Sequence, residues 1–143
     1  MKGRNLVIAL TVGFFCLSAY CMADEAQGEK GANLHKNIRI YSDELIPPTL
    51  QCKPGTTVTW VNFSRRIQAE IRFLDKEVTS AAECPTNFFI GMDDTFESHK
   101  VCIGCTASLC FQKKGTYHYM IRETKTFHPG AMHKEVRGTI IVE

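Results

Sequence analysis

Residues 50–62 read Leu-Gln-Cys-Lys-Pro-Gly-Thr-Thr-Val-Thr-Trp-Val-Asn. Lys53-Pro54-Gly55 supplies a turn, because proline presets one turn dihedral and glycine accepts a left-handed one. After the turn, Val58 and Trp60 alternate with threonines, so the two apolar side chains share one face of an extended strand. The stretch therefore predicts two β-strands joined by a tight turn, with Trp60 in the core.

A strand near the C-terminus divides its side chains in the same way. Within residues 115–121, Tyr117, Tyr119 and Ile121 fall on one face and His118 falls on the other. A period of two is the mark of a half-buried strand. We expect the first three residues in the core and His118 at the surface.

Short apolar or β-branched runs punctuated by turn residues continue through residues 37–143. This spacing is typical of an all-β sandwich. Residues 75–100 lack clear alternation and predict a long irregular excursion between the middle strands, with room for a short helix. The expected strands are residues 37–41, 49–52, 56–62, 69–74, 106–111, 115–121 and 138–142.

The N-terminus has the pattern of an export signal. Lys2 and Arg4 precede an uncharged apolar run over residues 6–17, which is shorter than the roughly 20 residues needed to span a bilayer. Cys21 and Ala23 place small side chains where a signal peptidase needs them. We predict three parts: a signal peptide at 1–23, a flexible lead-in at 24–36 and one domain at 37–143.

The predicted location is periplasmic or secreted, with no transmembrane segment in the mature chain. Lipid attachment at Cys21 is a weaker alternative because the bulky Tyr20 precedes it, and an uncleaved anchor is disfavoured by length. Cleavage removes two of the 17 basic residues, so the mature chain has as many basic residues as acidic ones, 15 of each. A chain without net positive charge gives no electrostatic reason to expect nucleic-acid binding.

Five of the seven cysteines follow the predicted cleavage site. In an oxidising compartment the ordinary arrangement is two disulfides and one remaining thiol. Cys102, Cys105 and Cys110, with Cys84 upstream, are alternatively a thiolate metal cluster. A redox-active pair at Cys102 and Cys105 is a further alternative, although no helix N-terminus is expected there to lower a thiol pKa. Cys52 is expected in the core or in a disulfide.

Four stretches, in this order, carry a family resemblance. They are residues 50–62, ending in Trp-Val-Asn; residues 96–104 with the following Phe111; Gly-Thr-Tyr-His-Tyr at 115–119; and Gly-Thr-Ile-Ile-Val at 138–142. Together they resemble the cupredoxins, small exported proteins that include the plastocyanin-like blue copper proteins. The resemblance covers residues 37–143 and implies a Greek-key β-sandwich, which in most relatives holds one type 1 copper for one-electron transfer.

The family's copper ligands match this sequence only in part. A type 1 site uses two histidines, a cysteine thiolate and a weak axial methionine. Where the resemblance places the first histidine, residues 67–71 contain none, and Ile121 stands where it places the cysteine. The loop before the last strand keeps His128 and Met132, and adds His133. Because imidazole and thioether ligands suit copper, these three residues are the candidate metal ligands.

These observations predict an exported cupredoxin-like protein that binds copper through a non-blue site. Its role would be copper handling or electron transfer, with a redox or copper-handling protein as partner. The alternative is a metal-free structural or interaction module stabilised by disulfides. No nucleophile, carboxylate pair or phosphate-binding glycine loop stands out, so we expect no enzymatic activity.

Overall fold

The turn at Lys53–Gly55 joins strand β3 (Thr49–Cys52) to strand β4 (Thr56–Asn62), as the sequence predicts. Gly55 has a φ of 84°, and its backbone N–H donates a 2.7 Å hydrogen bond to the carbonyl of Phe111. A left-handed φ is accessible to glycine without steric cost. The computed structural model describes residues 34–65, 68–124 and 135–143, which belong to one compact unit, Ala32–Glu143.

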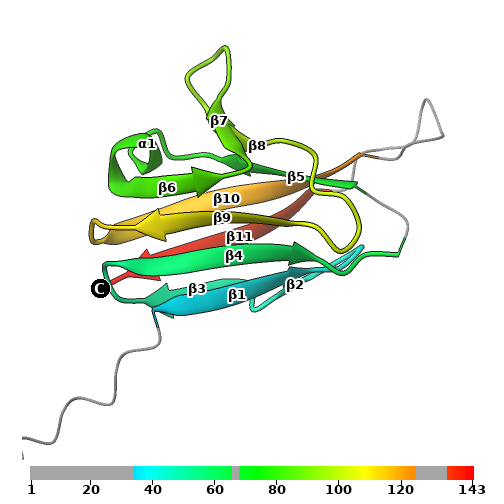
Figure 1. Cartoon of the computed structure of the whole chain (residues 1–143), viewed down its shortest axis with the longest axis horizontal. Coiled ribbons are helices and arrows are strands. Elements are labelled where there is room, and N and C mark those ends of the chain that lie inside the picture. Colours follow the sequence, from blue (N-terminus) through cyan, green and yellow to red (C-terminus); the bar gives the residue numbers. More distant parts are fainter. Residues whose placement is uncertain (1–33, 66–67, 125–134) are drawn as a thin grey trace, which may run out of the picture. The chain divides into compact units, whose positions relative to one another are not determined.

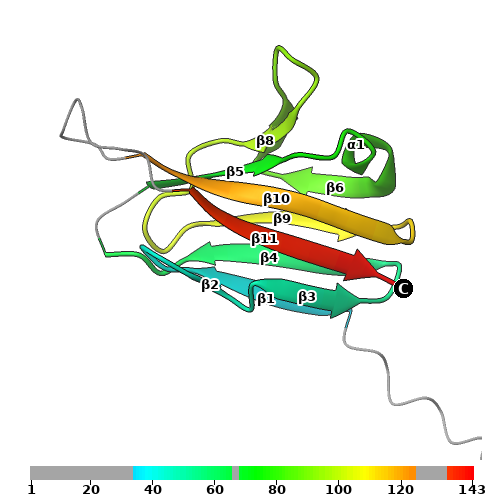
Figure 2. The same cartoon turned by 180° about the vertical axis from the view of Figure 1, so that it is seen from behind.

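Two β-sheets account for most of these residues (Figures 1 and 2). The first sheet has the order β2-β1-β4-β9-β6, and the second has the order β3-β11-β10-β5-β8-β7. The remaining bounds are β1 (His35–Ile40), β2 (Leu45–Ile46), β5 (Gln68–Phe73), β6 (Ala82–Thr86), β7 (Phe88–Ile90), β8 (Phe96–Ser98), β9 (Thr106–Phe111), β10 (Gly115–Thr124) and β11 (Glu135–Val142).

The core lies between the two sheets. Trp60 of the first sheet is fully buried and packs edge-on against Phe73 and Tyr119 of the second, with ring centroids 5.9 and 5.4 Å apart. Edge-to-face contacts of this kind are favourable because the ring edge is positive and the ring face is negative. The predicted core positions Trp60, Tyr117, Tyr119 and Ile121 are confirmed, and His118 is exposed as predicted.

The excursion at residues 75–100 is more regular than the sequence predicts. It contains the four-residue helix α1 (Val78–Ala81) and strands β6, β7 and β8. Four of the five residues of β6 are exposed because β6 forms an edge of the first sheet, so it cannot show apolar alternation. The predicted short helix is confirmed, and the three strands are additional to the prediction. Strands β7 and β8 form a hairpin that projects from the edge of the second sheet (Figures 1 and 2).

One end of the sandwich gathers the segments that matter for the site, and we call it the Asn62 end. Strand β4 finishes there at Asn62, β10 finishes at Thr124, and β11 starts at Glu135. The connection from β8 to β9 passes the same end, since Val101 pairs with Ala69 of β5 and Cys105 accepts a hydrogen bond from Asn62. In the described ranges, no helix is long and apolar enough to cross a membrane.

Candidate functional site

The three predicted metal ligands, His128, Met132 and His133, lie outside the described residues. The strands on either side of their loop are described. β10 and β11 form an antiparallel pair whose last matched residues before the loop are Arg122 and Glu135. The candidate ligands thus belong to the connection that leaves β10 and enters β11 at the Asn62 end.

Ile121 occupies the strand position where the resemblance places a copper-binding cysteine. Its side chain is 1% exposed, and it lies between Ile71 of β5 and Val136 of β11 in the ladder. Ala69, in the segment where the resemblance places the first histidine, is fully buried. An aliphatic side chain has no donor atom for a metal, so the described residues do not fit the type 1 ligand set at these positions.

Glu123 is a buried acidic residue that the sequence reasoning missed. It is 5% exposed and lies opposite Ala69 on the neighbouring strand, close to the end of β10. The predicted strand stopped at Ile121, and its continuation to Thr124 is what places Glu123 on the inner face. Alternation continued from Tyr119 and Ile121 would have found this carboxyl group. Glu123 therefore places a carboxyl group on the core side of the sandwich at this end.

Asn62 organises the loop that crosses the Asn62 end. Its side-chain Nδ2 donates a 2.8 Å hydrogen bond to the Val101 carbonyl, and its Oδ1 accepts a 2.9 Å bond from the backbone N–H of Ser64. Its backbone N–H donates to Cys105, and its carbonyl accepts from Gly104. Because Asn62 is fully buried and bonded in this way, its amide is not accessible for glycosylation, although Asn62-Phe63-Ser64 matches the acceptor pattern.

The predicted cysteine cluster divides between the two ends of β9. Cys102 and Cys105 form a disulfide with a Cα–Cα distance of 5.1 Å, just before β9 begins. Cys110 lies near the other end of β9, where it pairs with Glu83, the neighbour of Cys84. Among the described cysteines, the unpaired thiols are Cys52, Cys84 and Cys110. The structure thus brings together two of the four predicted cysteines.

The three thiols have different surroundings. Cys52 is buried in the core, where desolvation raises the pKa of its thiol. Cys110 is partly buried, and its Sγ lies 3.5 Å from the Gly55 carbonyl and 3.4 Å from Gln112 Nε2. Cys84 is exposed, with a left-handed φ of 48°. Across residues 34–65, 68–124 and 135–143, no three His, Cys, Asp or Glu side chains are close enough to hold a metal ion.

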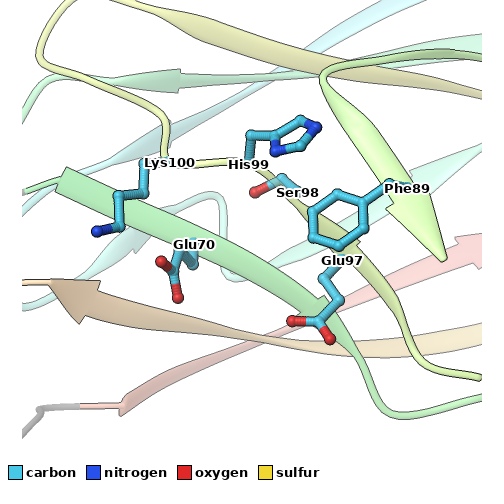
Figure 3. A pocket seen from close by; sticks show the side chains of 6 residues that line it. All are labelled: Glu70, Phe89, Glu97, Ser98, His99 and Lys100. Carbon is cyan, nitrogen blue, oxygen red and sulfur yellow. The ribbon is translucent and has the colours of Figure 1, made fainter. Parts of the chain in front are cut away.

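An open pocket lies beside the β7–β8 hairpin (Figure 3). Phe89 and His99 stack on one side of it with ring centroids 4.4 Å apart, and Lys100 with the carboxyl groups of Glu70 and Glu97 line the rest. Both signs of charge are present, and the pocket contains no nucleophile paired with a base. We assign it no chemistry.

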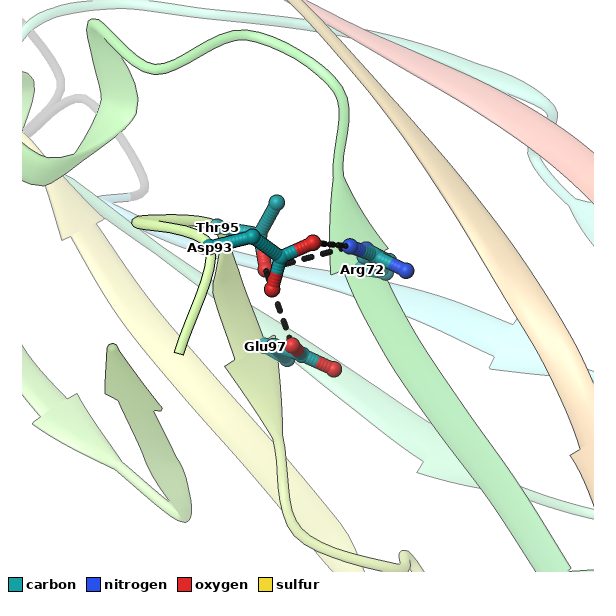
Figure 4. A network of polar contacts seen from close by, with 4 residues as sticks. All are labelled: Arg72, Asp93, Thr95 and Glu97. Carbon is teal, nitrogen blue, oxygen red and sulfur yellow. Dashed lines mark hydrogen bonds and ion pairs between the residues drawn. The ribbon is translucent and has the colours of Figure 1, made fainter. Parts of the chain in front are cut away.

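The same hairpin is tied to β5 by a polar network (Figure 4). Arg72 forms an ion pair with Asp93, and Thr95 Oγ1 donates a 2.8 Å hydrogen bond to Glu97 Oε1. The backbone N–H of Asp93 and the Arg72 guanidinium hold the pKa of the Asp93 carboxyl below its ordinary value. This network ties the hairpin to β5.

Solved structures share this arrangement of strands. An oxidised amicyanin variant matches with a TM-score of 0.50 and 23% identity, and a reduced amicyanin variant matches with a TM-score of 0.50 and 22% identity. Each match covers 80% of this chain and 87% of the other. The chain has the cupredoxin fold. No protein-family model matches the sequence, and no curated protein matches it.

The cupredoxin fold confirms the fold class predicted from residues 50–62 and their neighbours. Identity below 25% supports the architecture alone, so the ligands must be judged from this chain's own residues. Ile121 occupies the position expected for the copper-binding cysteine, and Ala69 lies in the segment expected to contain the first histidine. Neither side chain can bind a metal. The export signal, predicted for residues 1–23, lies outside the described residues.

Proposed function

We propose that this chain is an exported cupredoxin-fold protein that binds copper at a non-blue site, for copper handling or electron transfer, and that it is not an enzyme. The observation that carries the proposal is the donor set in one loop of this fold. The connection from β10 to β11 contains His128, Met132 and His133. Two imidazoles and a thioether suit both Cu(I) and Cu(II).

The choice of a non-blue site rests on Ile121. A blue centre depends on a thiolate bound strongly to Cu(II), and Ile121 offers only a buried hydrocarbon side chain at the strand end. The remaining donors are those of the loop. Bound copper would supply a centre that gains and loses one electron, while this chain's residues would supply imidazole nitrogen and thioether sulfur ligands.

A protein partner is consistent with the surface of the Asn62 end. Phe63 is 51% exposed and Ile103 is 56% exposed, and each is the chain neighbour of a residue in the Asn62–Gly104 hydrogen bond. Exposed apolar side chains at one site favour docking of another protein. The proposed partner is a redox or copper-handling protein that docks at this end.

Copper titration of the purified full-length protein tests the proposal. We expect stoichiometric binding that is lost in His128→Ala and Met132→Ala and weakened in His133→Ala. The matched control is His118→Ala, which removes an exposed histidine from β10 that interacts with Asp75. Unchanged binding in the loop variants would exclude the loop site. A strong visible absorption band on adding Cu(II) would instead indicate a cysteine-ligated blue centre.

A metal-free structural or interaction module is the second candidate, and the packing of Ile121 favours it. Ile121 fills the strand end with hydrocarbon, which stabilises the sandwich without a metal. Elemental analysis of protein purified from its native compartment, together with a thiol count, distinguishes the two candidates. If the protein purified from its native compartment contains no copper and also binds none in the titration, the metal-free module is supported.

A further inference from the structure

The Cys102–Cys105 disulfide lies at the Asn62 end and takes no part in the proposed copper loop. It spans Cys102-Ile103-Gly104-Cys105 in the connection from β8 to β9 (Figure 1). Cys102 is exposed and Cys105 is partly exposed. A sulfur atom at the surface is accessible to an attacking thiolate, which is the first requirement for thiol–disulfide exchange.

Hydrogen bonds hold the frame of this loop without the disulfide. On one side, Val101 exchanges two backbone hydrogen bonds with Ala69, of 2.8 and 3.1 Å, and its carbonyl also accepts from Asn62 Nδ2. On the other side, the Cys105 carbonyl accepts from the Asn62 backbone N–H at 3.1 Å, and the Gly104 N–H donates to the Asn62 carbonyl at 2.8 Å. Opening the S–S bond therefore leaves the two cysteines positioned side by side.

The disulfide contributes little that this frame does not already provide. Its sequence separation is three, and the loop-entropy gain of a crosslink is smallest for short loops. The Cys105 N–H also donates a 3.0 Å hydrogen bond to the Cys102 carbonyl, which closes the same turn. A purely stabilising crosslink would join distant segments, and this one joins neighbours.

We propose that Cys102 and Cys105 form a redox-controlled binding site for Cu(I), with ligands other than those of the proposed copper loop. In the oxidised state the pair is a disulfide and binds no metal. An external dithiol reduces it: the S–S bond breaks, two electrons and two protons pass to Cys102 and Cys105, and the external dithiol becomes a disulfide. The reduced pair then releases its two protons and binds Cu(I) through two thiolates.

The ligand count favours Cu(I) over zinc. Structural zinc needs four ligands, whereas the described residues place no third His, Cys, Asp or Glu with these two cysteines. The nearest cysteine along β9 is Cys110, five residues and about 17 Å from Cys105 at roughly 3.4 Å per residue. Thiolates are soft ligands and select Cu(I), for which the pair supplies two sulfur donors.

The test compares the oxidised and reduced forms of the full-length protein. Cu(I), buffered with bicinchoninate, is titrated anaerobically into protein reduced with a phosphine and freed of reductant. His128→Ala/Met132→Ala/His133→Ala serves as the background, so that loop binding is removed. We expect the reduced form to withdraw one equivalent of Cu(I) from the chelator and the oxidised form to withdraw none. Equal uptake by both forms, or none by either, would overturn the proposal.

Two variants complete the test. Cys102→Ser/Cys105→Ser should lose the uptake, and Cys84→Ser, which removes an exposed thiol on β6, should keep it. Near-ultraviolet circular dichroism of reduced wild-type protein checks that the sandwich stays folded, and loss of the folded signal on reduction would also overturn the proposal. Because the loop ligands are absent throughout, a negative result here leaves the proposed function at His128–His133 unaffected.

Discussion

The ring of Tyr119 lies directly over the α-carbon of Gly138, its cross-strand partner on β11. A β-carbon at residue 138 would lie nearer to two ring carbons and the phenol oxygen of Tyr119 than β-carbons lie to other atoms in real structures. Tyr119 is fully buried and packs on Trp60 and Phe73, so its ring cannot move away. Glycine at residue 138 is thus what allows the aromatic core to close over β11.

Gly138→Ala is expected to destabilise the protein. The added methyl group overlaps a ring held on its other faces, and overpacking of this kind lowers the free energy of unfolding by about 1–3 kcal/mol. Urea denaturation measures the change. In a Tyr119→Leu background the same alanine should cost much less, because leucine leaves the space free. An equal cost in both backgrounds would show that the ring is not the cause.

Tyr119 is expected to titrate abnormally at alkaline pH. Burial raises its pKa to about 12 from the ordinary 10.0, and the neighbouring Trp60 indole acts weakly in the opposite direction. The pKa of Tyr119 is higher in the folded protein than in the unfolded chain. The protonated phenol therefore contributes its full stabilisation below pH 10, and this stabilisation is lost as the pH rises to about 12. The loss corresponds to about 2–3 kcal/mol. Tyrosinate absorbance recorded with unfolding curves checks it.

Tyr119→Phe should remove the alkaline transition without destabilising the core at neutral pH. Among the described residues, the phenol oxygen makes no hydrogen bond of normal geometry, and neither does Trp60 Nε1. Removing a buried hydroxyl group without a partner changes stability little or raises it by up to about 1 kcal/mol. A large loss of stability at neutral pH would mean that the hydroxyl group has a partner.

The sequence predicts the strands that alternate and misses those that do not. Strands β3, β4 and β9 have the predicted bounds, because their inner residues are apolar and their outer residues are polar. β10 runs three residues further than predicted, since Arg122 and Glu123 conceal the alternation. β2, β6, β7 and β8 are short or lie at sheet edges, where solvent on one side removes the apolar pattern.

The candidate site was less predictable than the fold. Sequence spacing grouped Cys102, Cys105 and Cys110, but the extended strand β9 carries Cys110 to the other end of the sheet. The position of Asn62 beside Val101 could not be foreseen, because the two residues are 39 positions apart and meet through a single side-chain amide. Long-range contacts of this kind depend on how the sheets pack.

The β7–β8 hairpin should loosen at acid pH and in Arg72→Ala. The pKa of Asp93 is held below its ordinary value of 3.8 by its own backbone N–H and by Arg72. Because the pKa of Asp93 is lower in the folded protein than in the unfolded chain, the ion pair stabilises the hairpin above pH 3.8. This stabilisation is lost as the pH falls through the pKa of Asp93 in the folded protein. Hydrogen exchange of the Gly91 and Asp94 amides, which close the hairpin turn, measures the loosening.

Arg39→Ala is the matched control, because Arg39 is an exposed arginine on β1 in the other sheet. It should leave exchange in the hairpin unchanged. Since both members of the Arg72–Asp93 pair are at least partly exposed, added salt should also weaken its effect. Exchange at Gly91 that does not respond to Arg72→Ala would show that backbone bonds alone hold the hairpin.

Asn62→Ala is expected to damage the Asn62 end more than its size suggests. The change leaves the Ser64 N–H without the side-chain oxygen it bonds and takes the Nδ2 donor from the Val101 carbonyl. A buried polar group left without its partner costs about 1–3 kcal/mol. Thermal unfolding should show that loss, and Asn37→Ala, at an exposed position on β1, should not. Because Asn62 also frames the Cys102–Cys105 turn, the variant's disulfide should be reduced faster by an added dithiol. A stable variant with unchanged reduction would mean that the backbone bonds suffice to hold the loop.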